Sequence, residues 1–141
     1  MNIPSYFERA SERAVDLVNA ARESQKFAYA PYSNFRVGAA VLVDDGRIFT
    51  GCNVENSSFG MTVCAEQVAM FKAVSCGALD IVAVAFVTPT TTLSSPCGAC
   101  RQVIAEFSRI DNPTTIIFAC VTDETRIVTI NELFPNAFAL L

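Results

Sequence analysis

The stretch Ile81-Val82-Ala83-Val84-Ala85-Phe86-Val87 is an uninterrupted run of apolar residues, most of them β-branched or aromatic. The run is short enough for a β-strand. It lacks the polar residue at every second position that marks a strand with one face in water. We therefore expect a strand that is buried on both faces and lies at the centre of a sheet with helices on both sides.

One helix is expected before this strand in the sequence and another after it. Before it, the segment from Cys64 to Cys76 has apolar residues at helical spacing, and Gly77 is placed to end the helix in a left-handed cap. After it, Ser95 is expected as N-cap and Pro96 as the first residue of a helix that runs from about Cys97 to Ser108.

Two hairpins complete the predicted sheet. Apolar or β-branched runs at Phe35 to Val43 and Arg47 to Asn53 flank Asp44-Asp45-Gly46, which is typical of a tight turn. The acidic pair in this turn is interpreted as solvated turn chemistry rather than as a catalytic carboxylate pair. Two further runs, Thr114 to Val121 and Arg126 to Ile130, are so close in sequence that their strands can only pair antiparallel.

A helix precedes the first hairpin. Ser5 and Glu8 have the spacing of a capping box, and apolar residues recur at helical spacing until the helix ends near Phe27. A short helical turn is expected at Asn131 to Phe134. The order helix, hairpin, helix, strand, helix, hairpin predicts one α/β domain over residues 1–141, a three-layer α/β/α arrangement with a five-stranded mixed sheet whose last two strands are antiparallel.

The composition excludes several classes of protein. The 141 residues suit one domain with its own core, and 52% are hydrophobic, yet no apolar run reaches the roughly 18 residues of a membrane span. We therefore expect no membrane partner and infer that the surplus apolar surface meets other subunits. The net charge of -4 gives no basic surface for nucleic acid. Residues 1–5 lack the start of a signal peptide, so a cytoplasmic location is expected.

The chain contains no histidine, so a zinc site must be built from cysteine and carboxylate. Cys97 and Cys100 stand at i and i+3 on the first turn of a predicted helix, where both sulfurs point the same way and the helix N-terminus favours thiolates. Cys64 opens the other helix and supplies a third sulfur. Three ligands leave one position for water, whereas a structural zinc site is closed by four. Three other cysteines are interpreted as small buried hydrophobes: Cys52, Cys76 and Cys120.

Two charged residues lie next to these ligands. Glu66 follows Cys64 by two residues and can move a proton between a metal-activated water and a substrate. Taken alone, it is also a first-turn glutamate that favours the helix dipole. Beside three cysteines with ligand spacing, the catalytic interpretation is favoured. Arg101, next to Cys100, is the candidate for offsetting the charge of the thiolates.

These residues resemble those of a known family. The stretch Cys64-Ala65-Glu66, followed by Pro96-Cys97-Gly98-Ala99-Cys100, is similar to the signature of the zinc deaminases in its three-cysteine form. The surroundings resemble the small homotetrameric cytidine deaminases of free-nucleoside salvage, from about Tyr29 to Phe138. The similar stretches are Tyr29 to Phe35, Val37 to Ala40, Gly51 to Asn56 and Arg101 to Val103.

The resemblance implies a fold, a cofactor and a reaction. It implies a cytidine deaminase-like domain that binds Zn²⁺ through Cys64, Cys97 and Cys100, with Glu66 as proton shuttle. Asn53 and Glu55 would hold the ribose 3′-hydroxyl. The implied substrate-binding residues are Phe35, Asn53, Glu55, Ala65 and, from a neighbour's C-terminal tail, Phe138. The implied reaction is hydrolysis of free cytidine and deoxycytidine to uridine and deoxyuridine with release of ammonia, in a homotetramer that shares active sites between subunits.

Two departures from the family, two alternative interpretations of site residues and three rival functions stay open. Gln67 stands where the family usually has an arginine, and Phe59 where a tyrosine is common. Asn53 and Glu55 are also compatible with a solvated strand end, and Phe35 with core packing. The rival functions are a deaminase of a cytosine-containing antibiotic such as blasticidin S, a polynucleotide deaminase, which the acidity disfavours, and a non-catalytic protein whose structural zinc is closed by Cys120.

Overall fold

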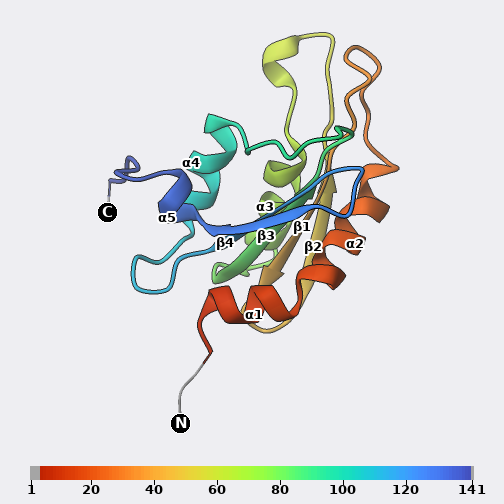
Figure 1. The fold of residues 1–141 in the computed structure, drawn as a ribbon. Coiled ribbons are helices and arrows are strands. Elements are labelled where there is room, and N and C mark those ends of the chain that lie inside the picture. Colours follow the sequence, from red (N-terminus) through yellow and green to blue (C-terminus); the bar gives the residue numbers. More distant parts are fainter. Residues whose placement is uncertain (1–3, 141) are drawn as a thin grey trace.

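The computed structural model describes residues 4–140, in which a five-stranded sheet lies between helices (Figure 1). The strands are β1 (Gly38–Val43), β2 (Ile48–Cys52), β3 (Ile81–Val87), β4 (Thr115–Ala119) and β5 (Thr125–Thr129). The helices are α1 (Tyr6–Glu12), α2 (Ala14–Gln25), η1 (Phe59–Met61), α3 (Ala65–Ser75), α4 (Gly98–Glu106) and α5 (Ile130–Leu133). Within residues 4–140, no helix combines the length and apolarity that crossing a membrane requires.

The apolar strand β3 is the middle of the order β2-β1-β3-β4-β5, and all of its residues are buried. It pairs antiparallel with β1 and parallel with β4, and helix α4 lies in the crossover that a parallel pair requires. The two outer pairs, β1 with β2 and β4 with β5, are antiparallel. The predicted mixed sheet with Ile81 to Val87 at its centre is confirmed.

The sheet separates two hydrophobic cores. On one face Val84 belongs to a cluster with Met70 of α3 and Ile104 of α4. On the other face Val87 belongs to a cluster with Leu17 of α2. Because successive side chains of a strand point to opposite faces, one apolar strand supplies both cores. Helices α1 and α2 cover one face, and α3 and α4 cover the other, as the three-layer prediction requires (Figure 1).

The N-terminal segment forms two helices, so the prediction of one helix up to Phe27 is wrong. The capping box is confirmed, because Ser5 Oγ accepts from the Glu8 N–H while the Glu8 carboxylate accepts from the Ser5 N–H. At Arg13 the backbone departs from helical geometry, with φ -100° and ψ 7°. Helix α1 contacts β3, β4 and β5, whereas α2 mainly contacts β1, β2 and β3. The break lets the two helices follow a twisted sheet.

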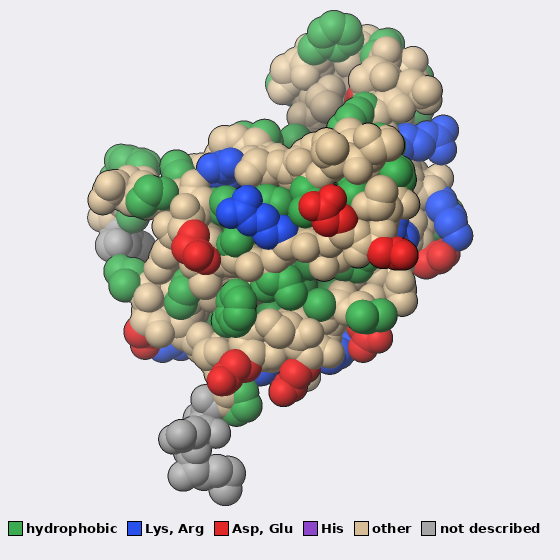
Figure 2. Space-filling model, in the orientation of Figure 1, with side chains coloured by type: hydrophobic (Ala, Val, Ile, Leu, Met, Phe, Trp, Pro, Cys, Tyr) green, Lys and Arg blue, Asp and Glu red, His purple; other side chains and the backbone are tan. Residues whose placement is uncertain are grey.

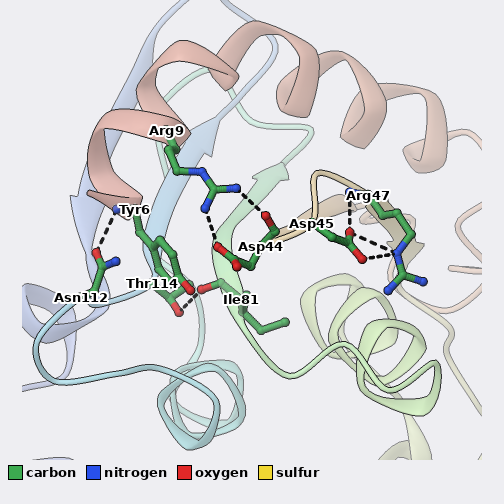
Figure 3. Close-up of polar contacts among 8 residues, drawn as sticks. All are labelled: Tyr6, Arg9, Asp44, Asp45, Arg47, Ile81, Asn112 and Thr114. Atoms are coloured by element: carbon green, nitrogen blue, oxygen red, sulfur yellow. Dashed lines mark hydrogen bonds and ion pairs between the residues drawn. The ribbon is translucent and has the colours of Figure 1, made fainter. Parts of the chain in front are cut away.

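The turn between β1 and β2 has the predicted chemistry. Gly46 adopts φ 95°, and the exposed carboxylates of Asp44 and Asp45 pair with Arg9 and Arg47 (Figure 3). These ion pairs tie the turn to α1 and to the start of β2. The acidic pair is therefore part of a solvated turn, as expected.

Two glycine positions explain where α3 lies. A Cβ on Gly51 of β2 would stand 2.5 Å from the Ala69 nitrogen and 2.7 Å from the Ala65 oxygen, so only glycine lets α3 come this close. At the other end of α3, Gly77 has φ 83° and follows the helix as predicted. Helix α3 therefore begins beside the end of β2, where the site described below is formed.

Candidate active site and metal centre

Three sulfurs converge where α3 and α4 begin. Cys64 is the N-cap of α3, Cys97 is the N-cap of α4, and Cys100 lies in the first turn of α4. Their ligand atoms all lie within 4.8 Å of one another. Cys97 Sγ lies 3.8 Å from Cys64 Sγ and 3.2 Å from Cys100 Sγ. Tetrahedral zinc with Zn–S bonds of about 2.3 Å holds its sulfurs about 3.8 Å apart, so this donor set fits zinc.

The start of α4 lies two residues later than the sequence pattern predicts. Ser95 and Pro96 are outside the helix, and Cys97 is the N-cap. Its sulfur accepts a hydrogen bond from the Cys100 N–H at 3.4 Å, so a thiol does what a serine hydroxyl was expected to do. Because of this shift, the sulfurs of Cys97 and Cys100 both lie at the positive end of the helix dipole.

The thiols share their protons unequally. The hydrogen bond that the Cys100 thiol gives to Cys64 lowers the pKa of Cys64 to about 7, although burial opposes the change. The same hydrogen bond, together with burial, raises the pKa of Cys100. A soft thiolate donor beside two further thiols suits zinc better than magnesium or calcium, which prefer oxygen.

Glu66 is the buried acid of the site. It lies in the first turn of α3 and is only 5% exposed. Burial raises the pKa of its carboxyl, and a hydrogen bond from Cys100 partly opposes that increase. The carboxyl thus lies beside the sulfur cluster in surroundings that favour its taking up a proton.

A pocket of about 310 Å³ opens beside the sulfurs. The predicted site residues that line it are Phe35, Asn53, Cys64, Ala65, Glu66 and Cys97. The pocket also has walls that the sequence analysis missed, among them Thr62, Phe86, Thr88 and Ser94. Phe86 lies near the C-terminal end of β3 and Thr88 directly follows the strand, so the rule that ligands bind at the ends of parallel strands could have pointed to them.

The side chain of Asn53 braces the pocket wall. It is 8% exposed, its Oδ1 accepts from the Val37 N–H at 2.9 Å, and its Nδ2 donates to the Phe35 oxygen at 2.7 Å. These bonds explain why β1 starts at Gly38 instead of Phe35. One amide hydrogen and one lone pair remain for a ligand. Phe35 is 41% exposed, so the core-packing alternative for this ring is wrong.

Glu55 and Phe138 do not line this pocket. The Glu55 carboxylate accepts hydrogen bonds from the backbone nitrogens of Tyr32 and Ser33 and from the Ser33 hydroxyl. These bonds lower the pKa of Glu55. The Phe138 ring is 69% exposed on the C-terminal tail. Both residues therefore lie outside the part of the pocket that one chain forms.

The side chain that faces a sulfur is Gln67 rather than Arg101. Gln67 Nε2 lies 3.6 Å from Cys100 Sγ, whereas the Arg101 guanidinium donates to the backbone oxygens of Pro96 and Leu133. The sequence contained the signal for this contact, because Gln67 lies three residues after Cys64 and shares its side of the helix start.

The remaining cysteines differ in their surroundings. Cys120 is buried as predicted, and its sulfur lies 3.1 Å from the Thr122 hydroxyl. Within residues 4–140 it does not belong to the sulfur cluster, which argues against a site that Cys120 closes. Cys52 is half-buried, and the expectation of burial is wrong for Cys76, which is exposed just after α3.

Comparison with known proteins agrees with this geometry. The family model for the cytidine and deoxycytidylate deaminase zinc-binding region matches residues 11–118. The chain belongs to this family. Zinc is accordingly the cofactor of this deaminase, and the three sulfurs are its candidate ligands.

Relatives cover most of this deaminase. The cytidine deaminase of Halalkalibacterium halodurans is 45% identical over 122 residues, which are 86% of this chain and 91% of that protein. The crystal structure of a cytidine deaminase from Burkholderia pseudomallei has a TM-score of 0.82 and 41% identity, covering 88% of this chain and 98% of that one. A blasticidin-S deaminase of Bacillus cereus is 32% identical over 133 residues, which are 89% of this chain and 91% of that protein.

Proposed function

We propose that this protein hydrolyses free cytidine and deoxycytidine to uridine and deoxyuridine, with release of ammonia, and serves pyrimidine salvage in the cytoplasm. The observation that carries the proposal is the three-sulfur cluster with buried Glu66 beside one pocket of about 310 Å³. The cytidine deaminases of similar sequence support the choice of substrate. We propose that residues 1–141 act as one domain.

Glu66 is the proposed catalytic residue. When bound, zinc acidifies a water molecule and so supplies a nucleophile near neutral pH. The Glu66 carboxylate would take a proton from this water and give it to N3 of the cytosine, which makes C4 electrophilic, and the water oxygen would add to C4. The same carboxyl would then move the remaining proton of the added hydroxyl to the amino nitrogen, so that the C4–N bond breaks and ammonia leaves. Burial keeps this carboxyl away from bulk water, so the proton passes between water and substrate.

The sugar and the base are recognised by separate groups. The free amide hydrogen and lone pair of Asn53 can both donate to and accept from the ribose 3′-hydroxyl. Glu55 is the proposed second partner of this hydroxyl, and its carboxylate keeps acceptor capacity beside its bonds to Tyr32 and Ser33. Phe35 is proposed to stack near the pyrimidine, with Ala65 at its edge, since both line the pocket.

The active enzyme is proposed to be a homotetramer that shares active sites between subunits. Large apolar side chains are exposed on the segments that follow α2 and β2, including Phe27, Tyr32, Phe59 and Met61. Figure 2 shows apolar atoms on the lobe that these segments form at the top of the molecule. A subunit interface over these side chains would remove them from water. The exposed Phe138 would reach a neighbour's pocket from the C-terminal tail.

Charge compensation at the sulfurs is proposed to come from several weak sources. The N-termini of α3 and α4 each present a partial positive charge. Gln67 adds one neutral donor to Cys100. The positive charge of Arg101 contributes from the adjacent position although its hydrogen bonds go to carbonyl oxygens.

One experiment tests the function. Purified protein is assayed for zinc content, for loss of ultraviolet absorbance on adding cytidine, and for ammonia. The Glu66→Gln variant is expected to keep its zinc and to lose about 10²- to 10⁴-fold in kcat, which is the contribution of a general acid-base group. Absence of ammonia from both cytidine and deoxycytidine would overturn the proposal.

Blasticidin S serves as the matched alternative substrate because a blasticidin-S deaminase is among the relatives. We expect cytidine to have the higher kcat/KM. Turnover of blasticidin S without turnover of cytidine would move the protein to that branch. Retention of zinc together with unchanged turnover in Glu66→Gln would mean that Glu66 is not the proton shuttle, and zinc without turnover of either substrate would favour a structural metal.

A further inference from the structure

Two neighbouring residues of α4 hold parts of the chain outside the helix. The Arg101 guanidinium donates through Nε to the Pro96 oxygen at 3.0 Å and through Nη1 to the Leu133 oxygen at 2.6 Å. Gln102 donates through Nε2 to the Phe138 oxygen at 3.1 Å. Helix α4 is thereby joined to the loop before Cys97 and also to the C-terminal tail, residues 134–140.

On the metal side, Arg101 restrains the peptide that leads into Cys97. The ring of Pro96 fixes its φ angle, and the hydrogen bond from Arg101 fixes the direction of its carbonyl. Cys97 follows with φ -66° and ψ 165° as the N-cap of α4. Arg101 therefore sets the backbone from which the Cys97 sulfur projects, although its own hydrogen bonds do not go to a sulfur.

On the tail side, Arg101 holds the end of α5. This helix has four residues, and its other end is held by the capping box of Thr129 and Glu132. The last carbonyls of a helix have no partner within the helix and carry its negative pole, so a guanidinium on the Leu133 oxygen satisfies both needs. Five residues later, Gln102 fixes the Phe138 backbone.

The backbone of the C-terminal tail is held by hydrogen bonds, whereas the Phe138 side chain is exposed. Between the two anchors the chain turns at Asn136, which has φ 58°. Phe134 packs against the core, whereas the Phe138 ring is 69% exposed. This arrangement fixes the backbone from which the exposed Phe138 ring extends.

We propose that Arg101 and Gln102 form a clamp, called here the α4 clamp, in which Arg101 positions the metal ligand Cys97 and Gln102 positions Phe138. Both are positioning residues. Arg101 thereby has a geometric task beside its charge, because one planar guanidinium reaches two carbonyl oxygens that a lysine ammonium cannot hold in the same fork. The Cys97 half stands on the structure alone, and the Phe138 half rests on the proposed function.

The metal half is tested by the rate at which the zinc-loaded protein gives up its metal to a chromogenic chelator, without substrate. We expect Arg101→Lys and Arg101→Ala to release zinc at least about tenfold faster than the unchanged protein, the size of effect seen when an outer partner of a metal ligand is lost. Millimolar guanidinium ion should slow zinc release from Arg101→Ala and should not alter the rate of zinc release from the unchanged protein. Such a rescue distinguishes a folded variant from a misfolded one. Release from Arg101→Lys at the unchanged rate would overturn the geometric role.

The tail half is tested with Gln102→Met, which keeps the length of the side chain and removes its donor. We expect unchanged zinc release, a several-fold higher KM for cytidine and little change in kcat. Glu106→Gln, exposed on the same helix, is the matched control and should match the unchanged protein. An unchanged KM in Gln102→Met would overturn this half.

Both halves of the α4 clamp proposal could be tested even if this protein did not deaminate cytidine. Zinc release still decides the role of Arg101, because it needs no substrate. Chymotrypsin cleavage after Phe138 then replaces KM, and it should be faster in Gln102→Met than in Glu106→Gln. Equal cleavage rates would count against the Gln102 contact.

Discussion

The metal end of the site and its proposed sugar end are built in different ways. At the metal end, Cys64, Glu66, Cys97 and Cys100 all lie at the starts of two helices, and one chain brings them together. At the sugar end, Glu55 is bound to the Tyr32–Ser33 turn and does not line the pocket. The metal end is thus organised by secondary structure, whereas the proposed sugar end is carried by loops.

One subunit can complete the metal end of the site on its own. Helix starts fix their residues through backbone hydrogen bonds and packing against the sheet, so the sulfurs converge without help. The loops near the sugar end carry exposed rings such as Phe59 and Tyr32, which contact each other at 5.8 Å between centroids. Their final arrangement is expected to depend on a neighbouring subunit.

The largest expected effect follows from breaking the metal end. Cys100→Ala removes one of three ligands and should abolish both zinc retention and deamination, since the ligand set supplies the binding energy for the metal. Cys120→Ala is the matched control, because Cys120 is equally buried and lies outside the cluster. It should keep full zinc content by atomic absorption. Loss of zinc from Cys120→Ala would mean that the site has a fourth protein ligand.

A smaller effect is expected where the two ends meet, at Asn53. Asn53→Ala leaves the Val37 N–H and the Phe35 oxygen without their side-chain partner. Each unsatisfied group costs about 1–3 kcal/mol, so urea denaturation should show lower stability, with kcat/KM for cytidine falling about thirtyfold. The exposed Asn56→Ala in the same segment should change both little. Equal effects of the two variants would contradict the brace at Asn53.

The sequence was sufficient for the metal end because its signals are local. A helix start, a Cys-x-x-Cys spacing and a glutamate two residues after a cysteine need only a few residues each, and the central strand is evident from its uninterrupted apolar run. The exact start of α4 was missed because a thiol can act as the cap, a use that capping preferences do not include.

Long-range contacts could not be predicted in the same way. The helix break at Arg13 depends on the twist of a sheet formed by later residues. The hydrogen bonds of Arg101 join Pro96 to Leu133, and only the folded chain brings these carbonyls together. Adjacency to Cys100 therefore suggested a purely electrostatic role for Arg101, whereas its hydrogen bonds to two carbonyl oxygens support the proposed positioning role as well.

At the sugar end, Glu55→Gln should raise the KM for cytidine about tenfold, since a charged acceptor binds a hydroxyl more strongly than an amide does. The hydrogen bonds from Ser33 hold the pKa of Glu55 below its ordinary value of 4.5. Because the pKa of Glu55 is lower in the folded than in the unfolded protein, the ionised carboxylate stabilises the turn at a pH above the ordinary pKa. This stabilisation is lost only as the pH falls through the lowered pKa. The KM ratio of variant to unchanged protein should therefore be constant from about pH 5 to about pH 8. A ratio that varied within this range would show that another group titrates there.

The smallest effect, and the sharpest test of which end depends on a neighbour, comes from the C-terminal tail. Phe138→Ala should leave zinc content and Tm unchanged, because the ring is 69% exposed and contributes little packing within its own chain. It should raise the KM about threefold if the ring completes the pocket of another subunit, as one peripheral aromatic contact would. Phe134→Ala makes the opposite change, since Phe134 packs against the core and its loss should lower Tm. An unchanged KM for Phe138→Ala would mean that one chain forms the whole pocket. The two ends would then differ only in how exposed their residues are.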